Sequence, residues 1–317
     1  MDKRWTQKPK ADKNLVESLS NELNKLDFTL TELLIQRGID TFEAAKQFFR
    51  PSLKHLHDPF LMKDMQEAVN RLQQAIEKNE NILVYGDYDV DGTTAVSLVY
   101  GFLQTFYPNI DYYIPDRYAE GYGISFTGID YAEDNDISLI IALDCGIKAI
   151  DKIEYANKKG IDFIICDHHT PGEEIPKAVA VLDPKRTDCN YPFKELSGCG
   201  VGFKLMYAYA QSQGISLDAL LDRLDILAVS ICADIVPIVG ENRILTYFGI
   251  QKLNDNPQPG FQAMLNLANV KKKSLTVTDV VFTLAPRINA AGRIESGNKA
   301  VEVMLSDNPD SALEGGT

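Results

Sequence analysis

The pattern of apolar and polar positions divides the chain into a helical beginning, a β/α middle and a helical end. In residues 1–78, apolar side chains recur three and four positions apart, which is the spacing of amphipathic helices. We expect helices near 14–26, 31–36, 41–49 and 64–78, with breaks at Gly38 and Pro51. Nothing in this region suggests catalysis.

From Asn81 onwards, short apolar runs alternate with helical stretches. The runs cover 82–85, 111–114, 137–143, 161–166 and 178–182, and the helical candidates between them cover 93–106, 125–133 and 148–159. Strands that are apolar on both faces and alternate with helices predict a parallel sheet covered on both sides. Helices then dominate from Val201 to Leu253.

The predicted fold class is therefore α/β, with a Rossmann-like, mostly parallel sheet flanked by helices. We expect an N-terminal helical region at 1–78, a catalytic domain at 79–240, and a helical connector at 241–317 that ends in the start of a second domain.

Acidic side chains follow three of the predicted strands. Asp87, Asp89 and Asp91 come directly after the first strand, Asp144 follows the third, and Asp167 follows the fourth. Carboxylates this close together repel one another unless a cation neutralises them or water solvates them fully. Because parallel sheets bind ligands at the carboxyl ends of their strands, we expect a metal site at this edge.

Two adjacent histidines bring imidazole groups to the same edge. His168 and His169 follow Asp167 directly. A mixture of carboxylate and imidazole ligands suits Mn²⁺ or a similar ion. Asp234 and Ser230 alone interrupt the apolar stretch 226–236, and a cation would offset the cost of burying that carboxylate. A buried, hydrogen-bonded aspartate is the alternative interpretation.

Two other motifs share part of this pattern. Residues 87–92 begin like a calcium-binding EF-hand loop, but Leu98 occupies the twelfth position, where a bidentate glutamate is needed. Residues 89–93 also resemble the first motif of haloacid-dehalogenase-like phosphatases, whose leading aspartate is a nucleophile. That mechanism leaves Asp144 and the histidine pair without a role, so it remains a distant alternative.

The order of these motifs resembles that of the DHH phosphoesterases. The matching positions are Asp89 with Asp91, Asp144, the run 167–169, and Asp234. The runs 113–117, 120–123, 197–202, 233–237 and 286–293 are similar to the RecJ branch in particular, and the resemblance covers residues 30–313. It implies a metal-dependent exonuclease that hydrolyses single-stranded DNA from the 5′ end towards the 3′ end in DNA repair and recombination.

The resemblance also implies a role for each matching residue. Two Mn²⁺ or Mg²⁺ ions would be held by Asp89, Asp91, Asp144, His168 and Asp234, with Asp144 as the bridge. His169 and Arg287 would act on the scissile phosphate, while Asp87 and Asp167 would orient ligands from outside. Substrate contacts would come from Arg117 at the 5′ phosphate, and from Gly198, Gly200, Asn289 and Arg293. A plain surface arginine and close helix packing are the alternatives for Arg117 and the glycines.

Composition limits the setting in which this chemistry takes place. The net charge of −13 argues against a general electrostatic hold on nucleic acid, so binding must use local patches such as Lys271–Lys273, unless that run is only a solvated loop. Five scattered cysteines without a C-x-x-C pair favour reduced thiols. With no signal peptide and no long apolar segment, we expect a cytoplasmic, monomeric protein that avoids membranes and has single-stranded DNA and repair or recombination proteins as partners.

Three functions fit the sequence. Besides the exonuclease, the chain fits another DHH phosphoesterase acting on short oligonucleotides, cyclic dinucleotides or pyrophosphate, or a non-catalytic DNA-binding scaffold. Arg117 and the segment around Arg287 favour the exonuclease, and the complete ligand set argues against the scaffold.

The RecJ branch also carries a second domain with a Gly-Gly-His motif and a DNA-binding barrel, and neither occurs in this sequence. Residues 308–310 predict a helix start seven residues before the end, so we expect a truncation, with normal metal binding but weak, salt-sensitive DNA binding.

Overall fold

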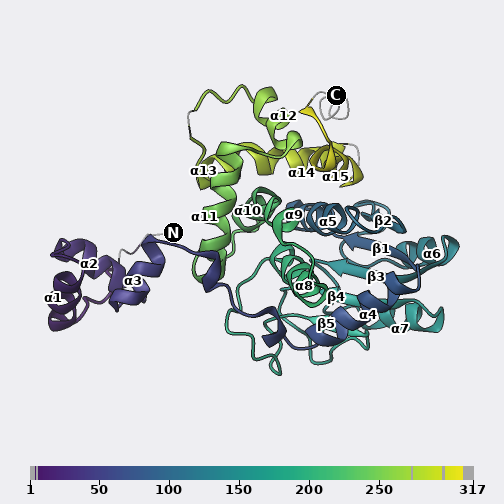
Figure 1. The fold of residues 1–317 in the computed structure, drawn as a ribbon, viewed down its shortest axis with the longest axis horizontal. Helices are drawn as coiled ribbons and strands as arrows, with labels where there is room; N and C mark the ends of the chain where they lie inside the picture. Colours follow the sequence, from purple (N-terminus) through teal and green to yellow (C-terminus); the bar gives the residue numbers. More distant parts are fainter. Residues whose placement is uncertain (1–3, 5, 273, 295–296, 310–317) are drawn as a thin grey trace. The chain divides into compact units, whose positions relative to one another are not determined.

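The computed structural model describes the chain except for residues 1–3, 5, 273, 295–296 and 310–317 (Figure 1). The side chains of 291–294 also lie outside the described part. The chain forms two compact units, residues 1–56 and 57–317. The helix expected after residue 308 falls on residues outside the described part.

The first unit consists of short helices with polar caps. α1 (Lys13–Glu22), α2 (Phe28–Ile35) and α3 (Phe42–Phe49) begin at Asp12, Asp27 and Thr41, whose side chains accept hydrogen bonds from amides of the first turn. The single turn η1 (Leu53–His55) follows. The predicted helices are confirmed, except that α1 ends before residue 26 because Asn24 and Lys25 adopt left-handed backbone angles.

The second unit is built on a five-stranded sheet. Its strands are β1 (Asn81–Gly86), β2 (Ile110–Tyr113), β3 (Ile137–Leu143), β4 (Asp162–Cys166) and β5 (Ala180–Leu182). They lie in the order β2-β1-β3-β4-β5, and every pairing is parallel. In Figure 1 the strands follow one another from β2 at the top to β5 at the bottom. This confirms the predicted parallel sheet.

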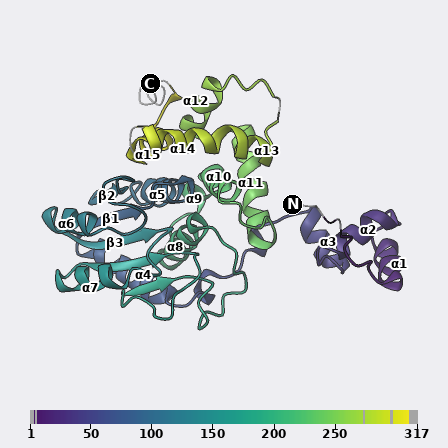
Figure 2. The ribbon, with the colours of Figure 1, turned by 180° about the vertical axis from the view of Figure 1, so that it is seen from behind.

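Helices cover both faces of the sheet. η2 (Pro59–Leu61) and α4 (Met65–Glu77) precede it, and α4, α5 (Val90–Leu103) and α8 (Gly198–Gln213) pack on one face. α6 (Phe126–Asp134) and α7 (Ile150–Lys158) lie side by side on the other face (Figure 2). Side chains that alternate along the strands, such as Ile140 and Phe163, form a buried core with α6 and α7. The strand order changes direction between β1 and β3, because β2 lies on one side of β1 and β3 on the other. Parallel sheets of this kind bind ligands at that point.

The remaining helices pack on α5 and on one another. They are α9 (Asp218–Leu221), α10 (Leu224–Ala233), α11 (Gly240–Asp255), α12 (Pro259–Leu267), α13 (Val277–Asp279), the π-helical turn η3 (Val280–Leu284), α14 (Ala285–Ile294) and α15 (Gly297–Leu305). α10 packs on α5 and α11, and α15 packs on α5. The approach of α11 to α10 requires Gly249, because a Cβ there would lie 2.2 Å from the Leu224 oxygen. No described helix has the length and apolarity needed to cross a membrane.

Candidate metal centre

Four of the strands end at the same level of the sheet. Gly86 pairs with Leu143, Leu143 with Cys166, and Cys166 with Leu182. The next residue after each of these is an aspartate, and Asp87, Asp144, Asp167 and Asp183 are all buried. Parallel register thus places four carboxylates along one edge. Asp183 is absent from the predicted site, although its position directly after a short apolar strand is the same signal that identifies Asp144.

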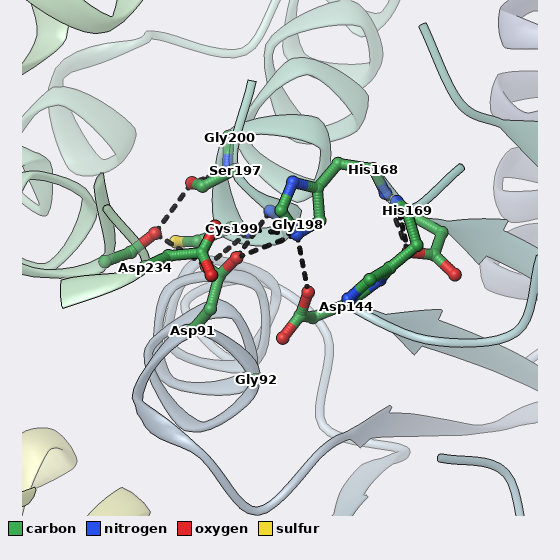
Figure 3. Close-up of polar contacts among 12 residues, drawn as sticks. Asp91, Gly92, Asp144, His168, His169, Ser197, Gly198, Cys199, Gly200 and Asp234 are labelled. Carbon is green, nitrogen blue, oxygen red and sulfur yellow. Dashed lines mark hydrogen bonds and ion pairs between the residues drawn. The ribbon is translucent and has the colours of Figure 1, made fainter. Parts of the chain in front are cut away.

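The imidazole of His168 lies among three carboxylates. Its Nε2 atom is 3.2 Å from Asp144 Oδ1, 3.6 Å from Asp234 Oδ2 and 3.7 Å from Asp91 Oδ2. Figure 3 shows these side chains converging from separate elements. Asp91, His168 and Asp234, and likewise Asp144, His168 and His169, offer ligand atoms within 4.8 Å of one another. The structure therefore gathers four of the five predicted ligands in one place.

Several atoms of this cluster are buried without a hydrogen-bond partner. They include Asp144 Oδ1 and both ring nitrogens of His168. Leaving such groups unpaired costs free energy, and a divalent cation is the complement that carboxylate and imidazole donors share. The donor set and its unpaired atoms fit a metal ion of the Mn²⁺ or Mg²⁺ type.

The raised pKa values of the carboxylates in the cluster also indicate a cation site. Burial, reinforced by Asp91 and Asp89, raises the pKa of Asp144 well above its usual value. Burial also raises the pKa of Asp234 to about 7, with Asp91 and Asp89 contributing, and that of Asp87 to about 7, with Asp89 contributing. Such carboxylates resist ionisation together, so a cation at their centre would stabilise the ionised form. Asp144 also has a left-handed backbone with φ of 59°, a strained conformation that is common at functional sites.

The first turn of α8 holds Asp91. The amides of Gly198 and Cys199 donate to Asp91 Oδ2 and Oδ1 at 2.6 and 3.0 Å, and the Ser230 hydroxyl donates to Oδ1 at 2.6 Å. Ser197 Oγ caps the helix by accepting from the Gly200 amide, and it lies 2.7 Å from Ser230 Oγ. We call Ser197, Ser230 and the two amides the Asp91 clamp. One feature of the sequence points to it, since Ser230 is a polar interruption of an apolar stretch.

The glycines at this helix start have an internal role in the structure. A Cβ at residue 198 would lie 2.5 Å from Asp144 Cβ, so only glycine allows α8 to come this close. The Gly198 amide donates to Asp91, and the Gly200 amide donates to Ser197 Oγ. Both donors are thus engaged within the protein, which differs from the expected contact with a substrate phosphate. The Gly198 amide serves the carboxylate of Asp91, and the Gly200 amide serves the N-terminal cap of α8.

Asp167 orders the histidine pair. Its carboxylate accepts hydrogen bonds from the amides of His168, His169 and Ile147 at 2.7, 3.1 and 2.9 Å, and it lies 2.7 Å from His169 Nδ1. This contact with Asp167 raises the pKa of His169. Burial opposes the ionisation of Asp167, but the contact with His169 and the hydrogen bonds from the amides of Ile147 and His169 together outweigh burial and lower the pKa of Asp167. This geometry supports the orienting role predicted for Asp167.

Two other predicted positions adjoin the cluster. Asp89 caps α5, because its Oδ1 accepts a hydrogen bond from the Gly92 amide at 3.0 Å. Asp87 Oδ1 accepts from the Gly123 amide at 3.2 Å, while Asp87 Oδ2 is buried without a partner. Asp87 therefore has an oxygen free for direct ligation, in addition to the orienting role predicted for it.

The predicted substrate residues lie at different distances from this centre. The Arg117 guanidinium lies over the ring of Tyr88, 4.9 Å from its centroid. Asn289 lines a cavity of about 330 Å³ together with Ala233, the neighbour of Asp234. Arg287 is exposed on α14 and donates to Thr283 O of the preceding turn η3 at 2.7 Å, so the structure does not bring it into the cluster. The side chain of Arg293 lies outside the described residues.

Comparison with known proteins identifies relatives for most of the chain. Residues 81–231 match the DHH family, N-terminal domain. The single-stranded-DNA-specific exonuclease RecJ of Bacillus subtilis is 40% identical over 313 residues, which cover 98% of this chain and 38% of that protein. The protein of the same name from Escherichia coli is 37% identical, over 88% of this chain and 50% of that one. The chain thus spans half or less of the length of these two relatives.

Solved structures show the same fold. An exonuclease RecJ bound to manganese superposes with a TM-score of 0.74 at 29% identity, covering 84% of this chain and 66% of that one. A Thermus thermophilus RecJ in complex with Mn²⁺ gives a TM-score of 0.80 at 24% identity, over 96% and 43% of the two chains, and supports the fold alone. The strand-end aspartates, the histidine pair and these similarities agree, and they identify residues 81–231 as an N-terminal domain of the DHH family.

Proposed function

We propose that this chain is the catalytic core of a metal-dependent exonuclease that hydrolyses single-stranded DNA from the 5′ end. The observation that carries the proposal is the position of His168 among Asp91, Asp144 and Asp234, with buried ligand atoms that lack partners. The names of the curated relatives supply the substrate.

Asp89, Asp91, Asp144, His168 and Asp234 would hold two Mn²⁺ or Mg²⁺ ions, with Asp144 shared between them. When bound, such ions make water nucleophilic near neutral pH and neutralise charge on the attacked phosphate. The protein supplies the arrangement: the Asp91 clamp fixes one carboxylate, and the left-handed backbone at residue 144 fixes another. Asp87 contributes either as an orienting group or through its unpaired oxygen.

His169 is the residue proposed to contact the scissile phosphate. Asp167 Oδ1 lies 2.7 Å from His169 Nδ1. The other ring nitrogen, Nε2, lies 3.3 Å from the Tyr122 hydroxyl. A proton held on Nε2 can be donated to a phosphate oxygen as negative charge develops. Arg287 would reach the same phosphate only after leaving its contact with Thr283.

Arg117 is proposed to bind the 5′ phosphate and so to set the direction of cleavage. Its loop also carries Tyr122, which touches His169, and this places Arg117 on an element that borders the metal centre. Asn289 and Arg293 remain proposed contacts to the strand. The amides of Gly198 and Gly200 would act through Asp91 and Ser197 instead.

A cellular setting is proposed as well. We propose DNA repair and recombination as the process and repair proteins as partners, following the substrate of the relatives. The five cysteines are free, which suits a reducing compartment such as the cytoplasm. A monomer is the proposed state.

The test of this function compares three substrates with the purified chain. We expect Mn²⁺-dependent release of mononucleotides from a 5′-phosphorylated single strand, slower release from a duplex, and no release in EDTA. Faster hydrolysis of a dinucleotide or cyclic dinucleotide than of the strand would favour the other DHH phosphoesterase activity. Metal binding without any hydrolysis would favour a non-catalytic scaffold.

A further inference from the structure

The loop that carries Arg117 begins with a turn that is closed by two hydrogen bonds. The Glu120 amide donates to Asp116 O at 2.9 Å, and the Asp116 amide donates to Glu120 Oε1 at 2.8 Å. Arg117 lies inside this turn, and Gly121 with φ of 86° and Gly123 with φ of 79° follow it. Glycines of this kind leave the backbone free to move, so the place of the turn relative to the metal centre depends on further contacts.

Two tyrosines from neighbouring strands supply these contacts. Tyr85 of β1 and Tyr113 of β2 are partners in the parallel register, and their rings stack with centroids 5.4 Å apart. The Tyr113 hydroxyl donates to Glu120 Oε1 at 2.9 Å. The Tyr85 hydroxyl donates to Gly123 O at 2.9 Å. We call these two residues the tyrosine pair, and its hydroxyls fasten both ends of the segment 120–123 to the sheet.

One peptide group joins the end of this segment to the metal centre. The Gly123 amide donates to Asp87 Oδ1 at 3.2 Å, while the oxygen of the same residue accepts from Tyr85. The Ser125 amide donates to the Tyr85 hydroxyl at 3.1 Å, and the Ser125 hydroxyl donates to Glu120. Burial raises the pKa of both members of the tyrosine pair, so their hydroxyls keep the protons that they donate. Hydrogen bonds therefore run without a break from the first turn of the loop to Asp87.

Glu120 has a charge that works against phosphate binding on this loop. A carboxylate three residues from Arg117 repels the phosphate that this arginine is proposed to hold. The oxygens of Glu120 accept hydrogen bonds from one amide and two hydroxyls, which come from the loop, β2 and the start of α6. These bonds indicate that the side chain serves to hold the loop in place.

We propose that Tyr85, Tyr113 and Glu120 are positioning residues that fix Arg117 at one distance from the metal centre and thereby set the length of the product. The inference rests on the proposed function, in which Arg117 holds the 5′ phosphate and the metal centre cleaves the strand. When that distance is fixed, one phosphodiester of the strand reaches the metal centre. A loop displaced by about 1 Å would misplace this phosphodiester, at a cost of about a hundredfold in rate, and would let the next one compete.

The test removes single hydroxyl groups from the network. Tyr85→Phe and Tyr113→Phe keep both rings and lose only the bonds to the loop. Tyr131→Phe is the matched control, because the Tyr131 ring also packs on Tyr113, with centroids 5.1 Å apart, but its hydroxyl donates to Asp111. Each protein digests a 5′-phosphorylated single strand with Mn²⁺, and the products are separated by length. Wild type and the control should release mononucleotides, and in the other two variants the share of longer products should rise about tenfold.

Glu120→Gln separates position from charge. If Glu120 did no more than repel phosphate, this change would strengthen the binding of a 5′-phosphorylated strand and leave the products unchanged. We expect instead that the preference for a phosphorylated over an unphosphorylated strand falls about three- to tenfold and that longer products appear. Asp134→Asn, which removes an exposed carboxylate at the end of α6, is the control for charge and should behave as wild type. Fluorescence anisotropy in EDTA measures both affinities without cleavage.

The outcomes separate this inference from a structural role and from the proposed function. A lower rate with the same products and the same preference for a 5′ phosphate would overturn the inference, and so would equal changes in Tyr131→Phe. Mn²⁺ affinity and melting temperature in Tyr113→Phe should remain close to those of wild type, since its hydroxyl contacts only Glu120. Absence of cleavage by wild type would contradict the proposed function. The phosphate preference in binding would then decide by itself whether these residues position Arg117.

Discussion

Helix α8 borders two buried groups of charged side chains that differ in how they are completed. Its first turn faces the metal centre, where Asp144 Oδ1 and the ring nitrogens of His168 have no partner. In its second turn, Lys204 donates to Glu241 at 2.6 Å and to His57 O at 2.9 Å.

The Glu241 group is satisfied from within the protein. Glu241 Oε2 accepts a hydrogen bond from the Tyr191 hydroxyl at 2.7 Å, and Glu241 Oε1 also accepts one from the His57 amide at 2.9 Å. Both groups are buried, so burial alone does not separate structure from function. The difference is that the metal centre lacks a positive charge that only a ligand can supply, whereas Lys204 already supplies it to Glu241.

The largest effect should come from removing the Asp144 carboxylate from the candidate metal centre. We expect Asp144→Ala to lower kcat/KM by roughly a thousandfold or more, because a ligand shared by both cations is lost. The metal-free variant should be at least as stable as wild type, since one of several mutually repelling carboxylates is gone. A discontinuous nuclease assay and thermal melts in EDTA measure both quantities. Activity within tenfold of wild type would refute the assignment of Asp144.

Removing the lysine from the Glu241 group should instead lower the stability of the protein. We expect Lys204→Met to lower the free energy of unfolding by about 3–5 kcal/mol, because Glu241 is left as an uncompensated buried charge. Urea unfolding in EDTA measures this loss. The double variant with Glu241→Gln should recover part of it, and Mn²⁺ affinity should remain that of wild type. Weaker Mn²⁺ binding in a folded Lys204→Met protein would show that the two groups are not separate.

A smaller effect should come from loosening the Asp91 clamp. Ser230→Ala should weaken Mn²⁺ binding by about 10- to 100-fold, since groups that orient a ligand contribute this much to affinity. Ser97→Ala is the matched control, because Ser97 is also a buried serine but donates to the backbone oxygen of Thr93. Isothermal titration with Mn²⁺ gives both constants. Equal affinities in the two variants would show that Ser230 only packs the helix.

The smallest effect should come from the exposed arginine. Arg117→Ala should reduce the preference for a 5′-phosphorylated over an unphosphorylated strand by roughly tenfold, with little change in the rate on saturating substrate. Competition between the two labelled strands measures the ratio directly. An unchanged ratio would place the 5′ phosphate elsewhere.

The parts of the molecule that depend on local pattern could be predicted from the sequence. The apolar runs locate the strands, and parallel strands bring the residues that follow them to one edge, so the proximity of Asp144 and His168 follows from the sequence alone. Beyond the polar interruption at Ser230, the Asp91 clamp could not be predicted, because it depends on how α8 meets α5. The approach of Lys204 to Glu241 depends on tertiary packing as well, since a lysine in a helix is usually exposed.

Arg287 shows the limit of a resemblance. A motif can assign the residue, but the orientation of α14 decides whether its side chain reaches the centre, and in this structure Arg287 contacts Thr283 instead. Asp183 shows a different limit, because it directly follows the predicted run 178–182 but is not among the positions that match the family motifs.

Titration of Mn²⁺ into the metal-free protein tests most directly whether the unpaired atoms around His168 are a metal centre. Calorimetry on wild type should give about two ions per chain and a rise in melting temperature with Mn²⁺. Asp144→Ala should lose both responses, and Lys204→Met should keep its Mn²⁺ affinity despite its lower stability. Unchanged Mn²⁺ binding in Asp144→Ala would contradict this assignment of the centre.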